Sequence, residues 1–123
     1  MKLGKKLCTS FGHAWQGLLV AFRNEFSFRL QLVAALAVGI LTFLLPLERW
    51  ERSIVILVIG AVLVLELLNS IVERFVDMVK PRIHDYAKQV KDLAAAAVLI
   101  MALTSLVLAG IIFWPYLHLL KSL

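Results

Sequence analysis

The sequence contains few of the residues that cross-link or interrupt a fold. Its one cysteine, Cys8, excludes an intrachain disulfide and is expected to be an ordinary apolar thiol on a surface helix. Its three prolines, Pro46, Pro81 and Pro115, lie at the ends of apolar runs, so none interrupts a run. The motifs G-x-x-x-x-G-K-[ST] and G-x-G-x-x-G are absent, which excludes the glycine-rich phosphate loops of the common nucleotide-binding folds.

Charged residues are scarce as well, at 17%, whereas 62% of the 123 residues are apolar and the mean hydropathy is +0.91. A single domain of this size buries the smallest share of its surface, so it could not hide this much apolar area in its own core. Lipid must therefore be the solvent for most of the chain.

Four segments are expected, and together they form one all-α membrane domain over residues 1–123. Residues 1–24 combine early lysines with apolar residues spaced by three or four, which is typical of an amphipathic helix lying on a membrane surface. Three apolar runs predict transmembrane helices over residues 26–45, 53–79 and 84–114, the second with a cytoplasmic extension. Leu47 to Arg52 is expected to form a short outer loop, and Pro81 to end the second helix.

The net charge of +5 is distributed unevenly along the chain. Ten of the 13 Lys and Arg residues precede the first apolar run or lie between the second and third: Lys2, Lys5, Lys6, Arg23, Arg29, Arg74, Lys80, Arg82, Lys88 and Lys91. This is the positive-inside pattern, which indicates a cytoplasmic N-terminus and second loop instead of a nucleic-acid partner. We predict a multi-pass membrane protein with its N-terminus and its polar site on the cytoplasmic side.

A stripe of polar residues continues the second apolar run. A helix turns by about 100° per residue, so the polar residues of this stripe all point within about 60° of Glu66 and share one helix face. They are Glu66, Asn69, Ser70, Glu73 and Asp77. The stripe is roughly 16 Å long at 1.5 Å per residue and begins inside the hydrocarbon at Glu66. Acidic residues at such a depth are costly and usually mark a functional site.

The residue types in this stripe suit phosphoryl transfer at a membrane surface. A carboxylate near the lipid headgroups can accept a proton from a hydroxyl, and further carboxylates can hold Mg²⁺ on ATP phosphates. Lys91 and Asp92, at the start of the third helix, add a cation and a carboxylate, and Glu25 adds another carboxylate from the first helix.

Two other interpretations compete with this one. Polar residues also hold transmembrane helices together, and Glu73 and Asp77 could simply face cytosolic water. A small oligomeric channel or transporter could line a pore with Glu66, Asn69 and Glu73. The channel is less favoured, because the outer halves of all three predicted helices are apolar.

Two segments carry a family resemblance. The run E-L-L-N-S-I-V-E from Glu66 to Glu73, followed by Asp77, resembles the E-[IL]-[LI]-N-[ST]-x-[IV]-E-x-x-x-D signature of the prokaryotic diacylglycerol kinase family, which includes the undecaprenol kinases. The run from Ala87 to Leu99 is similar to that family's A-K-x-x-K-D-x-A-A-x-A-V-L segment. The resemblance covers residues 10 to 115.

This resemblance implies a homotrimer with active sites shared between subunits, and an ATP- and Mg²⁺-dependent lipid kinase. Its acceptor would be diacylglycerol, giving phosphatidic acid, or undecaprenol, giving undecaprenyl phosphate. Ala94 and Ala95 follow Lys-Asp where the diacylglycerol-type enzymes carry a serine, which is closer to the undecaprenol-type pattern.

The resemblance also implies a role for each matching residue. Glu66 would be the general base, and Asn69 and Ala95 would join it in binding the lipid. Glu25 and Glu73 would hold the metal. The nucleotide-binding set would be Glu25, Glu73, Asp77, Lys91, Asp92 and His13, where His13 either stacks on adenine or is a polar tip at the interface.

The charge distribution makes orientation testable. We expect a reporter fused to the C-terminus to be active only in the outer compartment, because three spans with a cytoplasmic N-terminus place the C-terminus outside. Parallel fusions within residues 85–92 should be active only in the cytoplasm. A cytoplasmic C-terminus would contradict the three-span topology.

Overall fold

The computed structural model describes residues 2–79 and 84–122, and within those ranges the chain is helical with no strand. The helices are α1 (Lys2–Asn24), α2 (Phe26–Leu44), α3 (Arg49–Val79) and α4 (His84–Phe113), followed by the 3₁₀ turn η1 (Trp114–Tyr116) and the short α5 (Leu117–Leu120). The all-α prediction is confirmed. The predicted end of the second helix at Pro81 lies outside the described residues.

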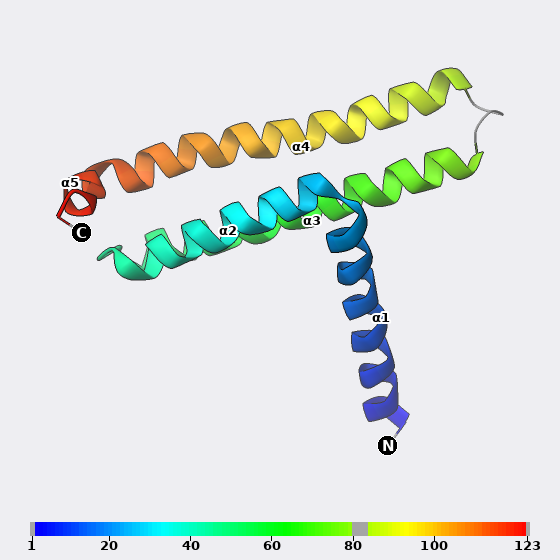
Figure 1. Ribbon diagram of the computed structural model, residues 1–123, viewed down its shortest axis with the longest axis horizontal. Coiled ribbons are helices and arrows are strands. Elements are labelled where there is room, and N and C mark those ends of the chain that lie inside the picture. Colours follow the sequence, from blue (N-terminus) through cyan, green and yellow to red (C-terminus); the bar gives the residue numbers. More distant parts are fainter. Residues whose placement is uncertain (1, 80–83, 123) are drawn as a thin grey trace.

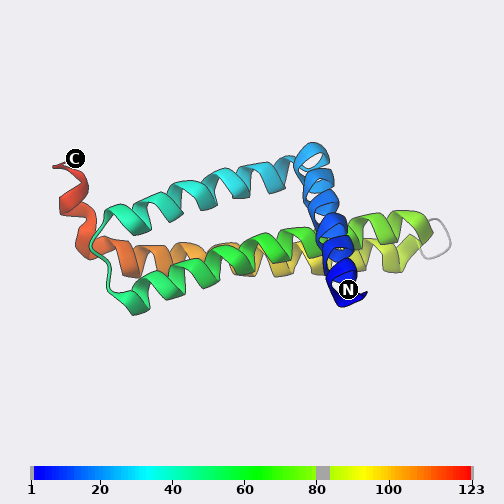
Figure 2. The same cartoon turned by 90° about the horizontal axis from the view of Figure 1, so that it is seen from below.

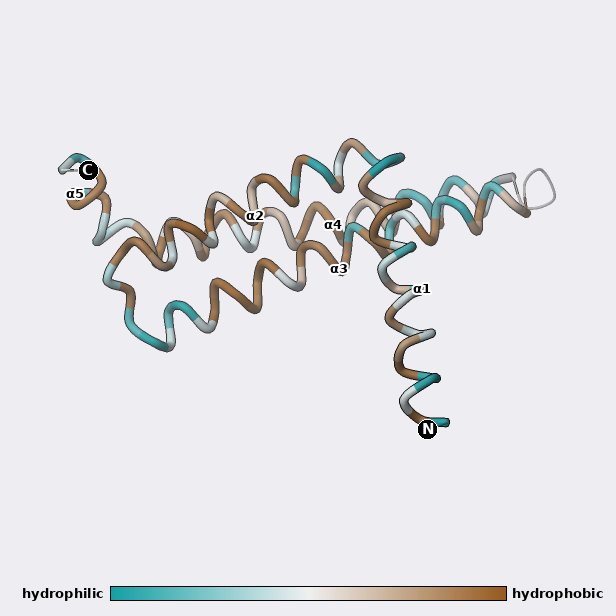
Figure 3. Tube along the Cα trace, turned by 60° about the horizontal axis from the view of Figure 1, so that its bottom comes forward, coloured by the Kyte–Doolittle hydropathy of each residue, from teal (hydrophilic) through white to brown (hydrophobic). Residues whose placement is uncertain are grey.

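Helices α2, α3 and α4 run side by side along the long axis of the molecule (Figure 1). Helix α3 packs against both of the others. All three are long and apolar enough to cross a membrane, as the apolar runs predicted. Hydrophilic residues gather where α3 and α4 continue past α1 and again at the α2–α3 connection, with apolar helix between (Figure 3). We call the first region the carboxylate end and the second the loop end.

Helix α1 leaves the bundle at a steep angle and crosses it near the carboxylate end (Figures 1 and 2). This is the orientation that a helix lying on the membrane surface needs when its neighbours cross the bilayer. Its predicted apolar face is exposed in the subunit and free to meet lipid, with Leu7, Phe11, Trp15, Leu18 and Phe22 all on the surface.

The break between α1 and α2 falls at one residue, Glu25, whose backbone is extended at φ −115° and ψ 106°. Arg29 holds the break from the far side, because its Nη1 donates to the carbonyl oxygens of Phe22 and Arg23 at 2.8 and 3.0 Å. These are end carbonyls of α1, which have no partner within the helix. The sharp turn places the Glu25 side chain against the bundle.

The loop end departs from the sequence prediction. Residues 49–52, expected in the outer loop, form the first turn of α3. The reason is a capping interaction: the Glu48 backbone N–H donates to Glu51 Oε1 at 3.0 Å, across the three-residue spacing of a capping box. Arg52 donates to the carbonyl oxygens of Thr42 and Leu45 at 3.0 and 3.2 Å and so closes the end of α2.

The C-terminal segment folds back onto this loop. Tyr116 Oη donates to Glu51 Oε1 at 2.7 Å, so the buried Glu51 carboxylate joins the start of α3 to η1. The main apolar core lies beside this bond and consists of Leu45, Leu47, Val55 and Ile112. Burial of a carboxylate is tolerated where donors surround it, and the loop end supplies them.

We expect Tyr116→Phe to destabilise the fold by about 1.5–3 kcal/mol, the usual value of a hydrogen bond to a charged group. Phenylalanine keeps the ring but leaves Glu51 short of one donor. Heat-induced loss of helical signal in detergent micelles measures the effect. Tyr86→Phe is the matched control, because Tyr86 is exposed on α4. Equal melting temperatures for the two variants would show that the Tyr116–Glu51 bond contributes nothing.

Candidate functional site

Three carboxylates from two parts of the chain meet where α1, α2 and α3 join. Glu66 on α3 is buried, with 6% of its surface exposed. Glu25 and Glu73 lie near enough for their charges to act on it, and the Gln31 side chain of α2 is directed at the Glu66 carboxyl. We call Glu25, Glu66 and Glu73 the carboxylate group. The predicted approach of Glu25 to the α3 stripe is therefore present within one subunit.

Asn69 orients one member of the group. Its Nδ2 donates to Glu73 Oε1 at 3.3 Å, one helical turn along α3. Its Oδ1 is buried and accepts no hydrogen bond within the described residues. A buried acceptor of this kind is costly unless a donor reaches it, and a hydroxyl group is one such donor. Ser70, also in the predicted stripe, is buried beside it.

The predicted residues farther along α3 and α4 form two ion pairs. Lys91 Nζ lies 2.7 Å from Asp77 Oδ1 and joins the two helices beyond the carboxylate group. Lys88 Nζ lies 2.9 Å from Asp92 Oδ2 on α4 itself, with both side chains mostly exposed. Asp77 and Lys91 thus continue the polar surface of the carboxylate end, whereas Asp92 pairs along its own helix.

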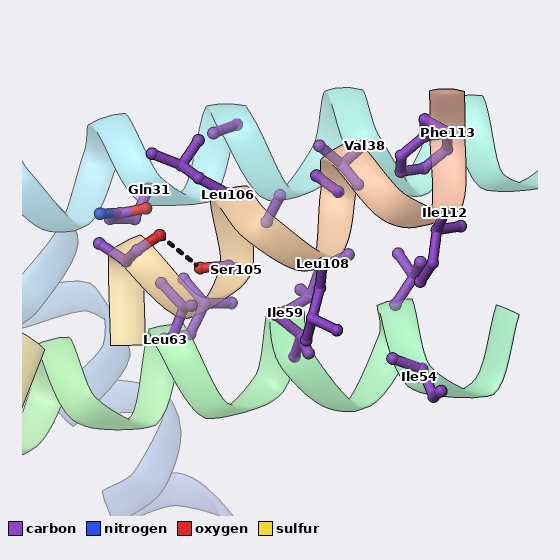
Figure 4. Close-up of a pocket in the computed structure, with 17 residues that line it drawn as sticks. Gln31, Val38, Ile54, Ile59, Leu63, Ser105, Leu106, Leu108, Ile112 and Phe113 are labelled. Carbon is purple, nitrogen blue, oxygen red and sulfur yellow. Dashed lines mark hydrogen bonds between the residues drawn. The ribbon is translucent and has the colours of Figure 1, made fainter. Parts of the chain in front are cut away.

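An apolar cavity of about 350 Å³ lies between α2, α3 and α4. Figure 4 shows its wall running from Gln31 and Leu63, near Glu66, to Ile54, Ile112 and Phe113 at the loop end. Ser105 lines the cavity, but its hydroxyl donates to the carbonyl oxygens of Met101 and Ala102 at 2.6 and 3.1 Å. Its polarity is thus satisfied within α4. The cavity is thus apolar, and the polar residue at one end of it is Gln31, the side chain directed at Glu66.

The carboxylate group suits a divalent cation in part. Within residues 2–79 and 84–122, no three His, Cys, Asp or Glu side chains are arranged to hold a metal by themselves. Mg²⁺ does not need such a cage, because it is usually held by one or two carboxylates together with substrate phosphates and water. Glu25 and Glu73 offer oxygen ligands of the right type and number.

Two predicted residues do not reach the group within a subunit. His13 is exposed on α1, twelve residues before Glu25, which is about 18 Å along a helix. Ala95 is exposed on α4. Their predicted roles in nucleotide and lipid binding stay predictions.

Sequence reasoning did not assign Gln31 or Arg74 to the site. Gln31 interrupts an apolar run, and that polarity was the available signal. Arg74 Nη2 lies 3.3 Å from Glu25 Oε1 across 49 residues of sequence. The sequence gives no comparable signal for Arg74, because its side chain points about 80° away from Glu66 on the helix and so lies outside the polar stripe.

The chain is similar to known proteins over most of its length. Residues 12–113 match the family model described as prokaryotic diacylglycerol kinase. The chain is 41% identical over 106 residues to the undecaprenol kinase of Bacillus subtilis (strain 168), covering 86% of both chains. It is 30% identical over 111 residues to the diacylglycerol kinase of Escherichia coli (strain K12), covering 90% of this chain and 91% of that one. It is 37% identical over 93 residues to the diacylglycerol kinase of Pseudomonas aeruginosa, covering 76% of each.

The family model spans most of the chain and includes every predicted site residue, from His13 to Ala95. With a buried carboxylate at the polar end of three membrane-length helices, the chain belongs to the prokaryotic diacylglycerol kinase family and is a lipid kinase.

Proposed function

We propose that this lipid kinase transfers the γ-phosphate of ATP to the hydroxyl of a polyprenol of the undecaprenol type. The observation that carries the site is the buried Glu66 carboxylate beside Gln31, the side chain that lines one end of an apolar cavity. A lipid alcohol has the same pattern, a hydroxyl on an apolar tail. The cavity would take the first part of the tail and leave the hydroxyl beside Glu66.

The choice of acceptor is supported by two observations. Identity is higher to the Bacillus subtilis undecaprenol kinase, at 41% over 106 residues, than to the Escherichia coli diacylglycerol kinase, at 30% over 111. Ala94 and Ala95 also replace the serine that the diacylglycerol-type pattern carries after Lys-Asp.

The chain's own residues divide the work of an in-line transfer. Glu66 takes the proton of the lipid hydroxyl, and Asn69 holds Glu73 in place through the hydrogen bond that its Nδ2 donates. Glu25 and Glu73 hold Mg²⁺. Bound there, Mg²⁺ would supply positive charge that offsets the negative charge of the transferred phosphoryl group. Lys91, Asp77 and Asp92 form the nucleotide-facing surface beyond the carboxylate group.

The active form we propose is a homotrimer in the bacterial inner membrane, with its carboxylate end in the cytoplasm. His13 and Ala95 lie away from the carboxylate group of their own subunit, so a neighbouring subunit could bring the nucleotide and lipid contacts predicted for them. A cytoplasmic carboxylate end places the site where ATP is found. The channel alternative is not favoured, because the cavity between the three helices is apolar along its length.

Acceptor preference is the first test. With labelled ATP and Mg²⁺ in mixed micelles, we expect kcat/KM for undecaprenol to exceed that for diacylglycerol by about tenfold or more, equivalent to about 1.4 kcal/mol. Both lipids are presented at the same mole fraction, and the products are identified as polyprenyl phosphate and phosphatidic acid. Faster transfer to diacylglycerol would reverse the acceptor assignment.

The base assignment gives a second test. We expect Glu66→Gln to lower the turnover rate by about 10²–10⁴-fold, because glutamine keeps the size of the side chain but cannot take the proton. ATP binding and assembly should be retained, since removing a buried charge does not harm a membrane bundle.

The matched control for Glu66→Gln is Glu51→Gln. Glu51 is a second buried carboxylate of α3, but it lies at the loop end. Its variant should lose stability while keeping normal turnover per folded molecule. If Glu66→Gln shows that pattern instead, with activity in proportion to folded protein, Glu66 has a structural role only.

A further inference from the structure

Arg74 is a cation at the carboxylate group that the proposed reaction has not yet used. Its Nη2 donates to Glu25 Oε1 at 3.3 Å, with 45% of the Arg74 side chain and 24% of the Glu25 side chain exposed. The neighbouring residue along the chain is Glu73. The guanidinium therefore lies at the open side of the group, against Glu25, one of the two carboxylates proposed to hold the metal.

The ion pair is not needed to hold the fold together at this point. The break between α1 and α2 is already held by Arg29, which bonds the carbonyl oxygens of Phe22 and Arg23. Ala21 and Phe28 are buried on its two sides. Glu25 occupies the N-cap position of α2, yet its side chain makes no capping hydrogen bond there. An ion pair as exposed as this one contributes little to the stability of a fold.

The balance of charge among the carboxylates indicates a role for the Glu25–Arg74 ion pair other than stability. Glu25 and Glu73 both lie near Glu66, and an excess of negative charge is unfavourable there. Arg74 offsets the charge of Glu25 while no metal is bound. A divalent cation on Glu25 would repel the guanidinium, whereas the phosphates that accompany the metal would attract it.

Arg74 has both the chemistry and the room for that exchange. A guanidinium presents a planar fork of donors that matches phosphate oxygens. Arg74 also lies at the edge of a second cavity, about 530 Å³ between α1 and α3, so open space adjoins its side chain. Lys91 already lies against Asp77 at 2.7 Å, farther along the bundle.

We propose that Arg74 is a phosphate-binding residue, which exchanges Glu25 for a nucleotide phosphate when Mg·ATP enters the site. The inference rests on the proposed function, because it takes ATP as the ligand and Glu25 as a metal ligand. It adds a residue that the predicted site did not contain, and it gives the Glu25–Arg74 pair a role in the state without nucleotide.

The exchange predicts opposite effects on two binding equilibria. Arg74→Gln should weaken binding of Mg·ATP by about tenfold or more, because a phosphate loses its charged partner. The same change frees Glu25, so Mn²⁺ without nucleotide should bind as tightly as to the wild type or tighter. Equilibrium binding of labelled ATP and the electron paramagnetic resonance signal of free Mn²⁺ measure the two on full-length protein in micelles.

Three variants make the result specific. Arg74→Lys keeps the charge and should retain part of the ATP affinity. Arg23→Gln removes an exposed arginine next to the same junction and should change neither equilibrium. Glu73→Gln removes a proposed metal ligand and is the reference for weakened Mn²⁺ binding.

Each remaining outcome contradicts a stated part of the inference. ATP affinity of Arg74→Gln within about twofold of the wild type would show that Arg74 does not bind phosphate. Weakening of both ATP and Mn²⁺ binding would show that the pair only supports the site. A wild-type protein that binds no ATP would overturn the proposed function and the Arg74 exchange with it, which distinguishes that failure from an error about Arg74 alone.

Discussion

The cost of placing charge in a hydrocarbon surrounding governs the arrangement of this protein. Glu66 is 6% exposed on a helix that is long and apolar enough to cross a membrane. An ionisable group in that position needs polar neighbours, and it needs them from other helices. Gln31 from α2 supplies one, and Arg74 offsets the charge of Glu25, the carboxylate that the break before α2 brings near. The meeting of α1, α2 and α3 at one level follows from that requirement.

Buried polar groups are hydrogen-bonded differently at the two ends of the bundle. At the loop end, Glu51 Oε1 accepts hydrogen bonds from Glu48 and Tyr116, and Arg52 closes the end of α2. At the carboxylate end, an amide oxygen of Asn69 is buried without a donor among the described residues. A satisfied network stabilises a fold, whereas an unsatisfied acceptor beside carboxylates is available to a ligand. The hydrogen bonds that stabilise the fold and the proposed ligand site thus lie at opposite ends of the same helices.

Between these ends, the apolar cavity offers a place for the tail of a lipid substrate whose hydroxyl would lie near the buried carboxylate. A hydroxyl on an apolar chain can reach Glu66 only if its tail has an apolar place to lie, and the groove between α2, α3 and α4 offers one. In the proposed reaction, ATP would meet the same carboxylates from the polar side. Two substrates of opposite polarity can therefore reach one set of oxygens from opposite directions, without either crossing the other's environment.

By itself, the sequence determined that the protein is helical, membrane-embedded and a lipid kinase of this family. Long apolar runs leave the backbone no other way to satisfy its hydrogen bonds in lipid, and the spacing from Glu66 to Asp77 defines one helix face whatever the neighbours are. Only the tertiary structure decided which distant side chains meet that face. Arg74 points away from the Glu66 stripe along α3, and its contact with Glu25 depends on the angle at which α1 joins α2. The start of α3 was likewise decided by contacts of Glu51 with Glu48 and Tyr116. A hydropathy pattern predicts a loop for a charged segment, because it contains no information about the hydrogen-bond donors that stabilise the segment as a helix.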